Sequence, residues 1–181
     1  MKTIETKLFS FKELSADAQS RVIERERKGI QSDPDDFTLG ECMDSLKAIA
    51  AALGVKLTNW NIGPYNRDNK CSCSSDESGN KSIARFARAL QSKGYTVPAR
   101  FKAMTFPRVC GFTGLCFDED ICEAMWEALL QGESLSKAFD RAADRIQTIC
   151  EDDLEYRQKD ESILENLDQS AEIYTDCGSV F

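Results

Sequence analysis

The spacing of apolar residues predicts helices along most of the chain. Apolar positions recur every three or four residues from 15 to 28, from 39 to 53 and from 83 to 90, and again in three stretches after residue 117. Each stretch is bounded by residue types that favour helix ends. The expected N-caps are Ser15, Asp118, Ser134 and Asp160, and the expected C-terminal stops are Gly29, Gly54 and Gly94.

Alternating polar and apolar residues predict a smaller set of strands. The pattern has a period of two in residues 3–11 and 55–61; residues 70–74 and 171–175 also predict strands, and 180–181 a short final pairing. Residues 55–75 therefore predict an antiparallel hairpin. The segment 109–117 is apolar with two glycines and fits either a strand or an extended loop. Together these elements predict an α+β fold, with a mainly antiparallel sheet centred on the hairpin and packed against several helices.

Length and segment composition predict one domain. A chain of 181 residues is long enough to bury a core without disulfides or metals, so we expect residues 1–181 to form a single domain, with 118–169 as a candidate helical subdomain. The first residues lack the apolar run of a signal peptide, and no stretch approaches the roughly 20 apolar residues of a membrane span. We expect a cytoplasmic protein that does not bind a membrane.

The amino-acid composition excludes several kinds of catalytic and metal-binding site. Histidine is absent, which excludes Ser-His-Asp and Cys-His catalytic sites and the commonest zinc ligand. The chain has eight cysteines, and a reducing compartment favours free thiols. Cys71 and Cys73 could donate two thiolates to zinc, with Cys110, Cys116 or Cys122 completing the set, but no second pair has the usual spacing. We expect packed thiols, no cofactor and no catalytic residues.

Charge is distributed unevenly along the chain. The net charge is −8; residues 1–117 hold 18 Lys and Arg against 13 Asp and Glu, whereas residues 118–181 hold 5 against 18. Such asymmetry bears on partners and solubility rather than on fold. The acidic end predicts either a solvated surface or one that binds a basic partner. The candidate residues are Asp118, Glu119, Asp120, Glu123, Glu127, Glu151, Asp152, Asp153 and Glu155.

A basic segment at 81–108 supports a different interpretation. Its cations are interleaved with Tyr95, Phe101 and Phe106, and basic and aromatic residues together can hold single-stranded nucleic acid. The alternative is a solvated helix face followed by aromatic residues of the core, and the overall negative charge opposes binding to nucleic acid. The residues of this segment are Lys81, Arg85, Arg88, Lys93, Arg100, Lys102 and Arg108.

Four blocks of the sequence have a familiar order. The first block, residues 9–18, has Glu13-Leu14-Ser15 before a helix, and the second, residues 51–62, has a glycine between a helix and a strand. The third block is 112–119, and the fourth consists of 160–161 and 173–178. In this order the chain resembles small proteins of unknown function that tailed phages and prophages encode. The resemblance implies a phage-type origin, and with it a role in countering host defences or redirecting host enzymes, but no catalytic residues.

The resulting expectation is a non-enzymatic accessory protein that binds a host protein or ribonucleoprotein complex in the host cytoplasm. It would inhibit or redirect that partner, as an anti-CRISPR-like inhibitor does, through the acidic surface. Two alternatives stay open: a nucleic-acid-binding protein that uses residues 81–108, and an enzyme that uses carboxylates and thiols in a pocket lined by groups such as Asp118. Direct binding of nucleic acid is the less favoured partner class, and the sequence does not indicate an oligomeric state.

Overall fold

The computed structural model describes residues 7–32, 37–63, 69–97, 111–113 and 117–181. It confirms an α+β fold, in which helices pack against a two-stranded antiparallel hairpin. The chain divides into two compact units. We call residues 36–151 the central unit and residues 1–35 with 152–181 the terminal unit. Each has its own hydrophobic core.

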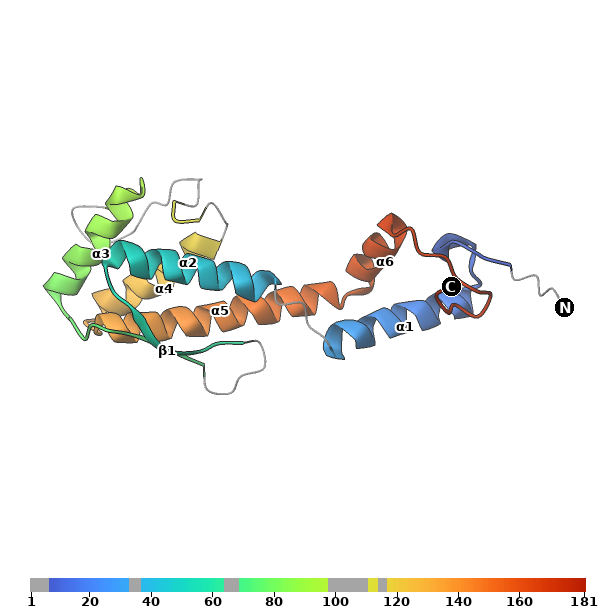
Figure 1. Cartoon of the computed structure of the whole chain (residues 1–181), viewed down its shortest axis with the longest axis horizontal. Helices are drawn as coiled ribbons and strands as arrows, with labels where there is room; N and C mark the ends of the chain where they lie inside the picture. The colour runs from blue at the N-terminus through green and yellow to red at the C-terminus, as the bar shows by residue number, and fades with distance from the viewer. Residues whose placement is uncertain (1–6, 33–36, 64–68, 98–110, 114–116) are drawn as a thin grey trace, which may run out of the picture. The chain divides into compact units, whose positions relative to one another are not determined.

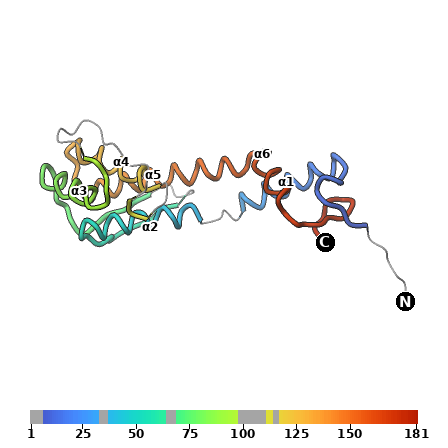
Figure 2. Tube along the Cα trace, turned by 90° about the horizontal axis from the view of Figure 1, so that it is seen from above, coloured from blue at the N-terminus to red at the C-terminus, as the bar shows by residue number. Residues whose placement is uncertain are grey.

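This division differs from the expected one. The predicted subdomain 118–169 is split between the two units after Glu151. The terminal unit instead joins the two ends of the chain, because α1 (Ala16–Ser32) packs against α6 (Asp160–Gln169). Both views of the backbone show these helices side by side (Figures 1 and 2). Contacts between segments so far apart in sequence leave no trace in local periodicity.

The helices of the central unit lie close together (Figure 1). They surround one apolar cluster. The helices are α2 (Phe37–Leu53), α3 (Asn80–Ser92), α4 (Phe117–Leu130) and most of α5 (Leu135–Arg157). Residues with no exposed surface from all four helices meet there. They include Leu46, Ile49, Phe86, Leu90, Met125, Leu129, Phe139 and Ile146.

The hairpin confirms the strand prediction at 55–75. Strand β1 (Leu57–Asn61) pairs antiparallel with β2 (Lys70–Cys73), with an irregularity between Leu57 and Asn59. Because alternate residues of a strand share a face, Cys71 and Cys73 both point into the core. The exposed face carries a hydroxyl pair between Thr58 and Ser72, whose oxygens lie 3.1 Å apart.

The predicted terminal strands are reduced to isolated bridges. Tyr174 bridges Phe9 on one side and Val180 on the other. Residues 1–6 lie outside the described part of the chain, and Phe11–Glu13 forms a 3₁₀ turn rather than the end of a strand. The reason is local: Ser10 and Glu13 form a capping box, in which the Glu13 carboxylate accepts a hydrogen bond from the Ser10 backbone N–H and so favours a helical turn.

Helix boundaries confirm part of the capping prediction. The Ser15 hydroxyl accepts from the Ala18 backbone N–H, the Ser134 hydroxyl accepts from that of Lys137, and Gly54 follows α2 at a φ of +62°. Three expectations were wrong. Gly29 lies inside α1, and Asp118 and Asp160 lie within the first turns of their helices instead of preceding them.

Candidate functional site

The exposed face of α4 carries a row of carboxylates. One side of this helix is buried in the central core, which places Glu119, Glu123 and Glu127 on the opposite, solvent-facing side. Residues four apart lie one above another on a helix, about 6 Å apart along its axis. We call Glu119, Glu123 and Glu127 the α4 acidic row. The buried residues that orient it are Ile121, Cys122, Met125, Trp126, Ala128 and Leu129.

The α4 acidic row has no counter-ion within the described part of the chain, where no ion pair or side-chain hydrogen bond involves its members. Neighbouring carboxylates differ in this respect. Asp120 pairs with Arg145, and Glu133 with Arg141 at 3.0 Å. The row is therefore a place where negative charge is exposed and uncompensated, and like charges at four-residue spacing repel each other mildly. A cationic partner would relieve that repulsion.

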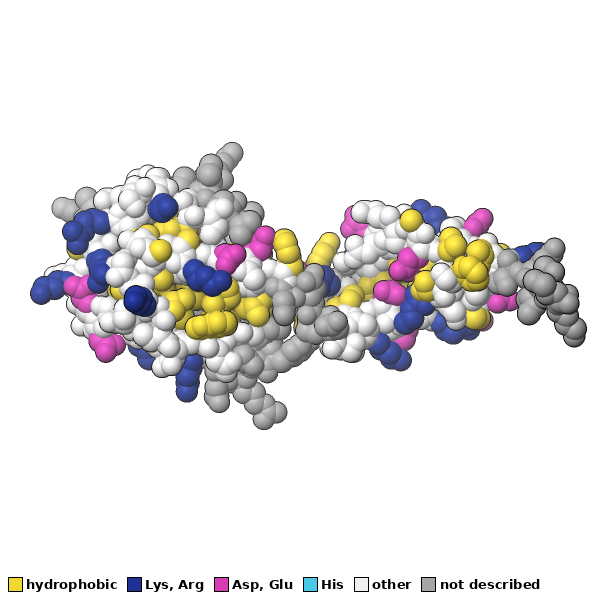
Figure 3. Space-filling model, viewed as in Figure 1, with side chains coloured by type: hydrophobic (Ala, Val, Ile, Leu, Met, Phe, Trp, Pro, Cys, Tyr) yellow, Lys and Arg dark blue, Asp and Glu magenta, His cyan; other side chains and the backbone are white. Residues whose placement is uncertain are grey.

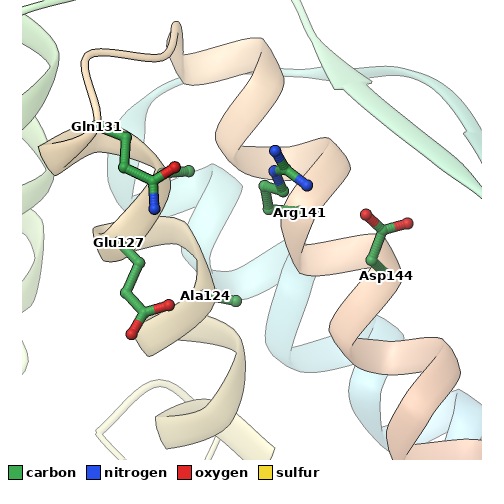
Figure 4. A pocket seen from close by; sticks show the side chains of 6 residues that line it. Ala124, Glu127, Gln131, Arg141 and Asp144 are labelled. Carbon is green, nitrogen blue, oxygen red and sulfur yellow. The ribbon is translucent and has the colours of Figure 1, made fainter.

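A groove lies beside the row, between α4 and α5 (Figure 4). Its volume is about 310 Å³, Ala124 and Ala128 contribute small apolar side chains, and Glu127 and Gln131 line its α4 side. Arg141 and Asp144 line it from α5. Because the Arg141 guanidinium is bound by Glu133, the Glu127 and Asp144 carboxylates leave the groove with a negative balance. An alkyl chain ending in a cation matches this combination of surfaces.

Asp118 does not belong to the acidic surface, contrary to the sequence analysis. It is fully buried, and its carboxylate accepts the backbone N–H of Phe112 at 2.9 Å and that of Thr113 at 2.8 Å. The Thr113 hydroxyl donates a third bond at 2.9 Å. With its oxygens engaged in this way, Asp118 anchors the 111–113 turn to α4 and lines none of the described pockets. This argues against its use as a catalytic acid or base.

The remaining acidic candidates lie near the end of α5, and most are engaged locally. Glu151 accepts a bond from Gln147 at 2.6 Å. Asp153 pairs with Arg157 at 3.0 Å, and Glu155 lies 3.9 Å from the Lys159 ammonium. Asp152 is exposed. The boundary between the two units falls between Glu151 and Asp152, so Glu151 belongs to the same unit as the α4 acidic row, whereas Asp152, Asp153 and Glu155 belong to the terminal unit.

The basic segment provides fewer free cations than the sequence analysis expected. Arg85 is engaged: its guanidinium donates to the Leu53 carbonyl at 2.8 Å and lies 3.4 Å from Glu77, so it caps the end of α2. Lys93 lies over the Phe112 ring at 5.8 Å. Lys81 and Arg88 remain exposed on α3. Arg100, Lys102 and Arg108, with Phe101 and Phe106, lie outside the described residues.

The aromatic part of that segment is in the core where it is described. Phe86 is fully buried and stacks on Trp126, and Tyr95 is buried and stacks on Phe112. Neither ring is available to stack on a base. Among the described residues of the central unit, two aromatic side chains are exposed: Phe37 on α2 and Trp60 on β1.

The two cysteines of β2 are packed thiols. Cys73 donates to the Ser75 carbonyl at 3.3 Å, and burial raises the pKa of Cys71 to about 12. Deprotonation is required for zinc binding, so such a pKa opposes it. In the described residues no three His, Cys, Asp or Glu side chains converge as metal ligands. Cys110 and Cys116, two of the candidates for completing the zinc set, lie outside the described part of the chain.

One reactive group was not singled out from the sequence. Cys177 lies exposed in a turn of the terminal unit, where the Ser179 and Thr175 hydroxyls lie 3.4 Å and 3.1 Å from its sulfur. Hydrogen bonds from Ser179 and Thr175 lower the pKa of Cys177 to about 7. A turn containing Asp176, Cys177 and Gly178 was expected from composition, but the convergence of two hydroxyls on the sulfur depends on how that turn closes.

Comparison with known proteins adds no relative: no family model, curated protein or solved structure matches the chain. None of the helices in the described residues is long and apolar enough to cross a membrane.

Proposed function

We propose that this chain is a non-enzymatic binding protein whose α4 acidic row, Glu119, Glu123 and Glu127, contacts a basic surface on another macromolecule. The observation that carries the proposal is the exposure of three carboxylates on one helix face without counter-ions among the described residues. Several other carboxylates pair with cations of the chain itself, as in Lys12 with Asp168 at 2.9 Å and Arg141 with Glu133. A row left unpaired is free to meet cations of a partner.

The charges of the row contribute to affinity and to the rate of association in different ways. A single exposed ion pair is worth about 0–1 kcal/mol, so no one glutamate would dominate the affinity. Several aligned charges attract a complementary surface over longer distances and raise the association rate. Salt screens exposed charges beyond about 10 Å at 0.1 M ionic strength. Binding should therefore weaken strongly as salt increases.

The resemblance to phage-encoded proteins supports a more specific form of this proposal. In that form the partner is a host protein or a ribonucleoprotein complex with a basic nucleic-acid groove. The α4 acidic row would occupy the groove and so inhibit or redirect the complex, as an anti-CRISPR-like anti-defence protein does. The support lies in charge complementarity: a groove that binds phosphates presents Lys and Arg, the groups that a carboxylate row binds.

The experiment is capture from a bacterial lysate on the immobilised chain, with washes at low and then high salt and mass spectrometry of the eluates. We expect a protein or ribonucleoprotein complex that is held at low salt and released at high salt. Retention that is indifferent to salt, or recovery of nucleic acid alone, would contradict the proposal.

A second candidate function is direct binding of nucleic acid. It is favoured by one observation, the exposure of Lys81 and Arg88 seven residues apart on one face of α3. A gel-mobility assay with single- and double-stranded DNA and RNA at low salt tests it. A shift that disappears in the Lys81→Glu/Arg88→Glu variant would assign binding to this face, and no shift at low salt would remove this candidate.

A further inference from the structure

A small cavity opens between α1 and α6 in the terminal unit. Its volume is about 210 Å³, and its apolar walls are Ile30 from α1 and Ile163 and Leu167 from α6. Ile163 and Leu167 are buried in the apolar cluster of that unit, and Ile30 packs against the same cluster. The cavity therefore has a floor of packed core side chains, against which a hydrocarbon group can be removed from water.

Polar side chains form the rest of the lining, and two of them are carboxylates with one oxygen engaged. The Arg25 guanidinium donates two bonds to Glu26 Oε1, at 3.1 and 2.9 Å, and the Tyr174 hydroxyl donates to Glu172 Oε2 at 2.8 Å. No described residue bonds to the other oxygen of either carboxylate, or to the side-chain amide of Asn166. The lining therefore offers three oxygens that can accept hydrogen bonds from a ligand.

The charge of the cavity favours a ligand with one positive charge. Among the described residues that line it, two are carboxylates and none is Lys or Arg. Arg25 offsets the charge of Glu26 from outside the lining, where its guanidinium also donates to the Gly178 carbonyl at 3.0 Å and lies over the Tyr174 ring at 5.8 Å. One negative charge remains, which a single cation on the ligand would balance.

We propose that this cavity binds a small primary amine, with its hydrocarbon body against the three apolar side chains and its ammonium group bound by Glu26 and Glu172. A primary ammonium has three N–H donors and no acceptor, which matches the two open carboxylate oxygens and the Asn166 amide oxygen. The cavity is smaller than the about 300–1,000 Å³ of sites for drug-sized ligands, so the amine must be small. This proposal does not depend on the proposed binding function.

The burial of the lining residues orients the ligand. Glu172 and Asn166 are exposed, whereas Ile163 and Leu167 are buried, so the charged group binds at the mouth and the hydrocarbon lies deeper. Each half of the ligand is insufficient alone. An exposed ion pair contributes little by itself, and a neutral hydrocarbon leaves the carboxylates without a counter-ion. Phenethylamine combines both parts, whereas 2-phenylethanol lacks the charge and methylamine lacks the hydrocarbon body.

The test titrates these three probes into the full chain at neutral pH and follows Ile and Leu methyl groups by NMR. We expect phenethylamine to give saturable shifts at Ile30, Ile163 and Leu167 with a dissociation constant of about 1 mM or below, and none at Ile49 or Ile146 in the central core. The other two probes should bind at least about fivefold more weakly, because each keeps only part of the contacts.

A pair of matched variants tests the role of the carboxylate. Glu172→Gln removes the charge and keeps an oxygen that can accept from Tyr174, so phenethylamine should bind at least about threefold more weakly. Glu165→Gln removes the same charge from an exposed position of α6 outside the cavity lining and should change affinity by less than about twofold. Equal effects of the two variants would overturn the proposal.

Two results on the parent chain would also overturn it, whatever the variants do. One is the absence of saturable shifts at the three lining residues with phenethylamine up to about 20 mM. The other is equally tight binding of 2-phenylethanol, which would make the cavity a site for neutral apolar groups.

Discussion

At the scale of single residues, the same side-chain type has opposite roles at neighbouring positions of α4. Asp118 is buried and fully bonded, whereas Glu119 one residue later is exposed and unpaired. The sequence predicted a cluster of acids at a helix start but not which of them would turn inward. That depends on the 111–113 turn, whose backbone N–H groups point at one carboxylate and at no other.

Removing the Asp118 carboxylate should destabilise the fold. Asp118→Ala leaves the Phe112 and Thr113 backbone N–H groups without their acceptor, and an unsatisfied buried donor costs about 1–3 kcal/mol. We expect a loss of that size in the free energy of unfolding measured by urea denaturation. Glu123→Ala on the same helix is the control and should change stability by less than about 0.5 kcal/mol. Equal effects in the two variants would contradict the assigned role.

The thiol of Cys177 should titrate near neutrality. Hydrogen bonds from Ser179 and Thr175 stabilise the thiolate and lower the pKa to about 7, so the alkylation rate should rise through a midpoint near that pH. Replacing both donors, as Thr175→Val and Ser179→Ala, should move the midpoint upward toward the ordinary thiol value of about 8.5. Iodoacetamide labelling of Cys177, followed by mass spectrometry across pH 5–10, measures it. A midpoint that is the same in the parent and the double variant would refute the cause given.

At the scale of elements, local patterns predicted the helices and the hairpin well because each buries one face. The residues of α2 recur at helical spacing and Gly54 ends it at positive φ, as expected from sequence. The prediction failed at Gly29, which continues α1 to Ser32. Arg27 explains why the last turns of α1 persist: it binds Asp160 and the Gln158 carbonyl in the segment that leads into α6. Such a tertiary contact is invisible to local propensity.

Two glycines should respond in opposite ways to alanine. Gly29 lies in a helix interior with nothing within 4 Å of an added Cβ, so Gly29→Ala should stabilise the protein by about 0.5–1 kcal/mol. Gly54 has a φ of +62°, where a side chain is strained, so Gly54→Ala should destabilise it. Thermal melts followed by circular dichroism compare the two. A lower melting temperature for Gly29→Ala would be inconsistent with the helical assignment at this position.

At the scale of the whole molecule, basic and acidic residues that lie far apart in the sequence come together within one unit of the fold. The terminal unit carries nine Lys and Arg against sixteen Asp and Glu, whereas the central unit carries fourteen against fifteen. Within the terminal unit, Lys12 pairs with Asp168 and Arg27 with Asp160, so cations from the start of the chain meet acids from its end. Figure 3 shows both charge types interspersed on the visible face of that unit.

This arrangement could not be predicted from the two halves of the sequence. A division at residue 117 suggested one basic and one acidic region, but the contact of α1 with α6 neutralises part of the acidic end. Glu119, Glu123 and Glu127 were among nine acidic candidates in the sequence, and their spacing places them on one side of α4, but the sequence did not separate them from the buried Asp118 or the paired Asp120. Helical spacing was enough to place these three residues on one side of α4. Contacts between distant segments determine which of the other acidic residues are paired.

The most direct measurement of the central claim compares two matched charge reversals in lysate capture. Glu123→Lys/Glu127→Lys reverses two members of the α4 acidic row, and Glu161→Lys/Glu165→Lys reverses two exposed glutamates at the same spacing on α6. We expect the α6 variant to retain the salt-sensitive partner and the α4 variant to lose at least about tenfold of it, because like charges then face the partner's cations. Equal retention by both variants would contradict the account.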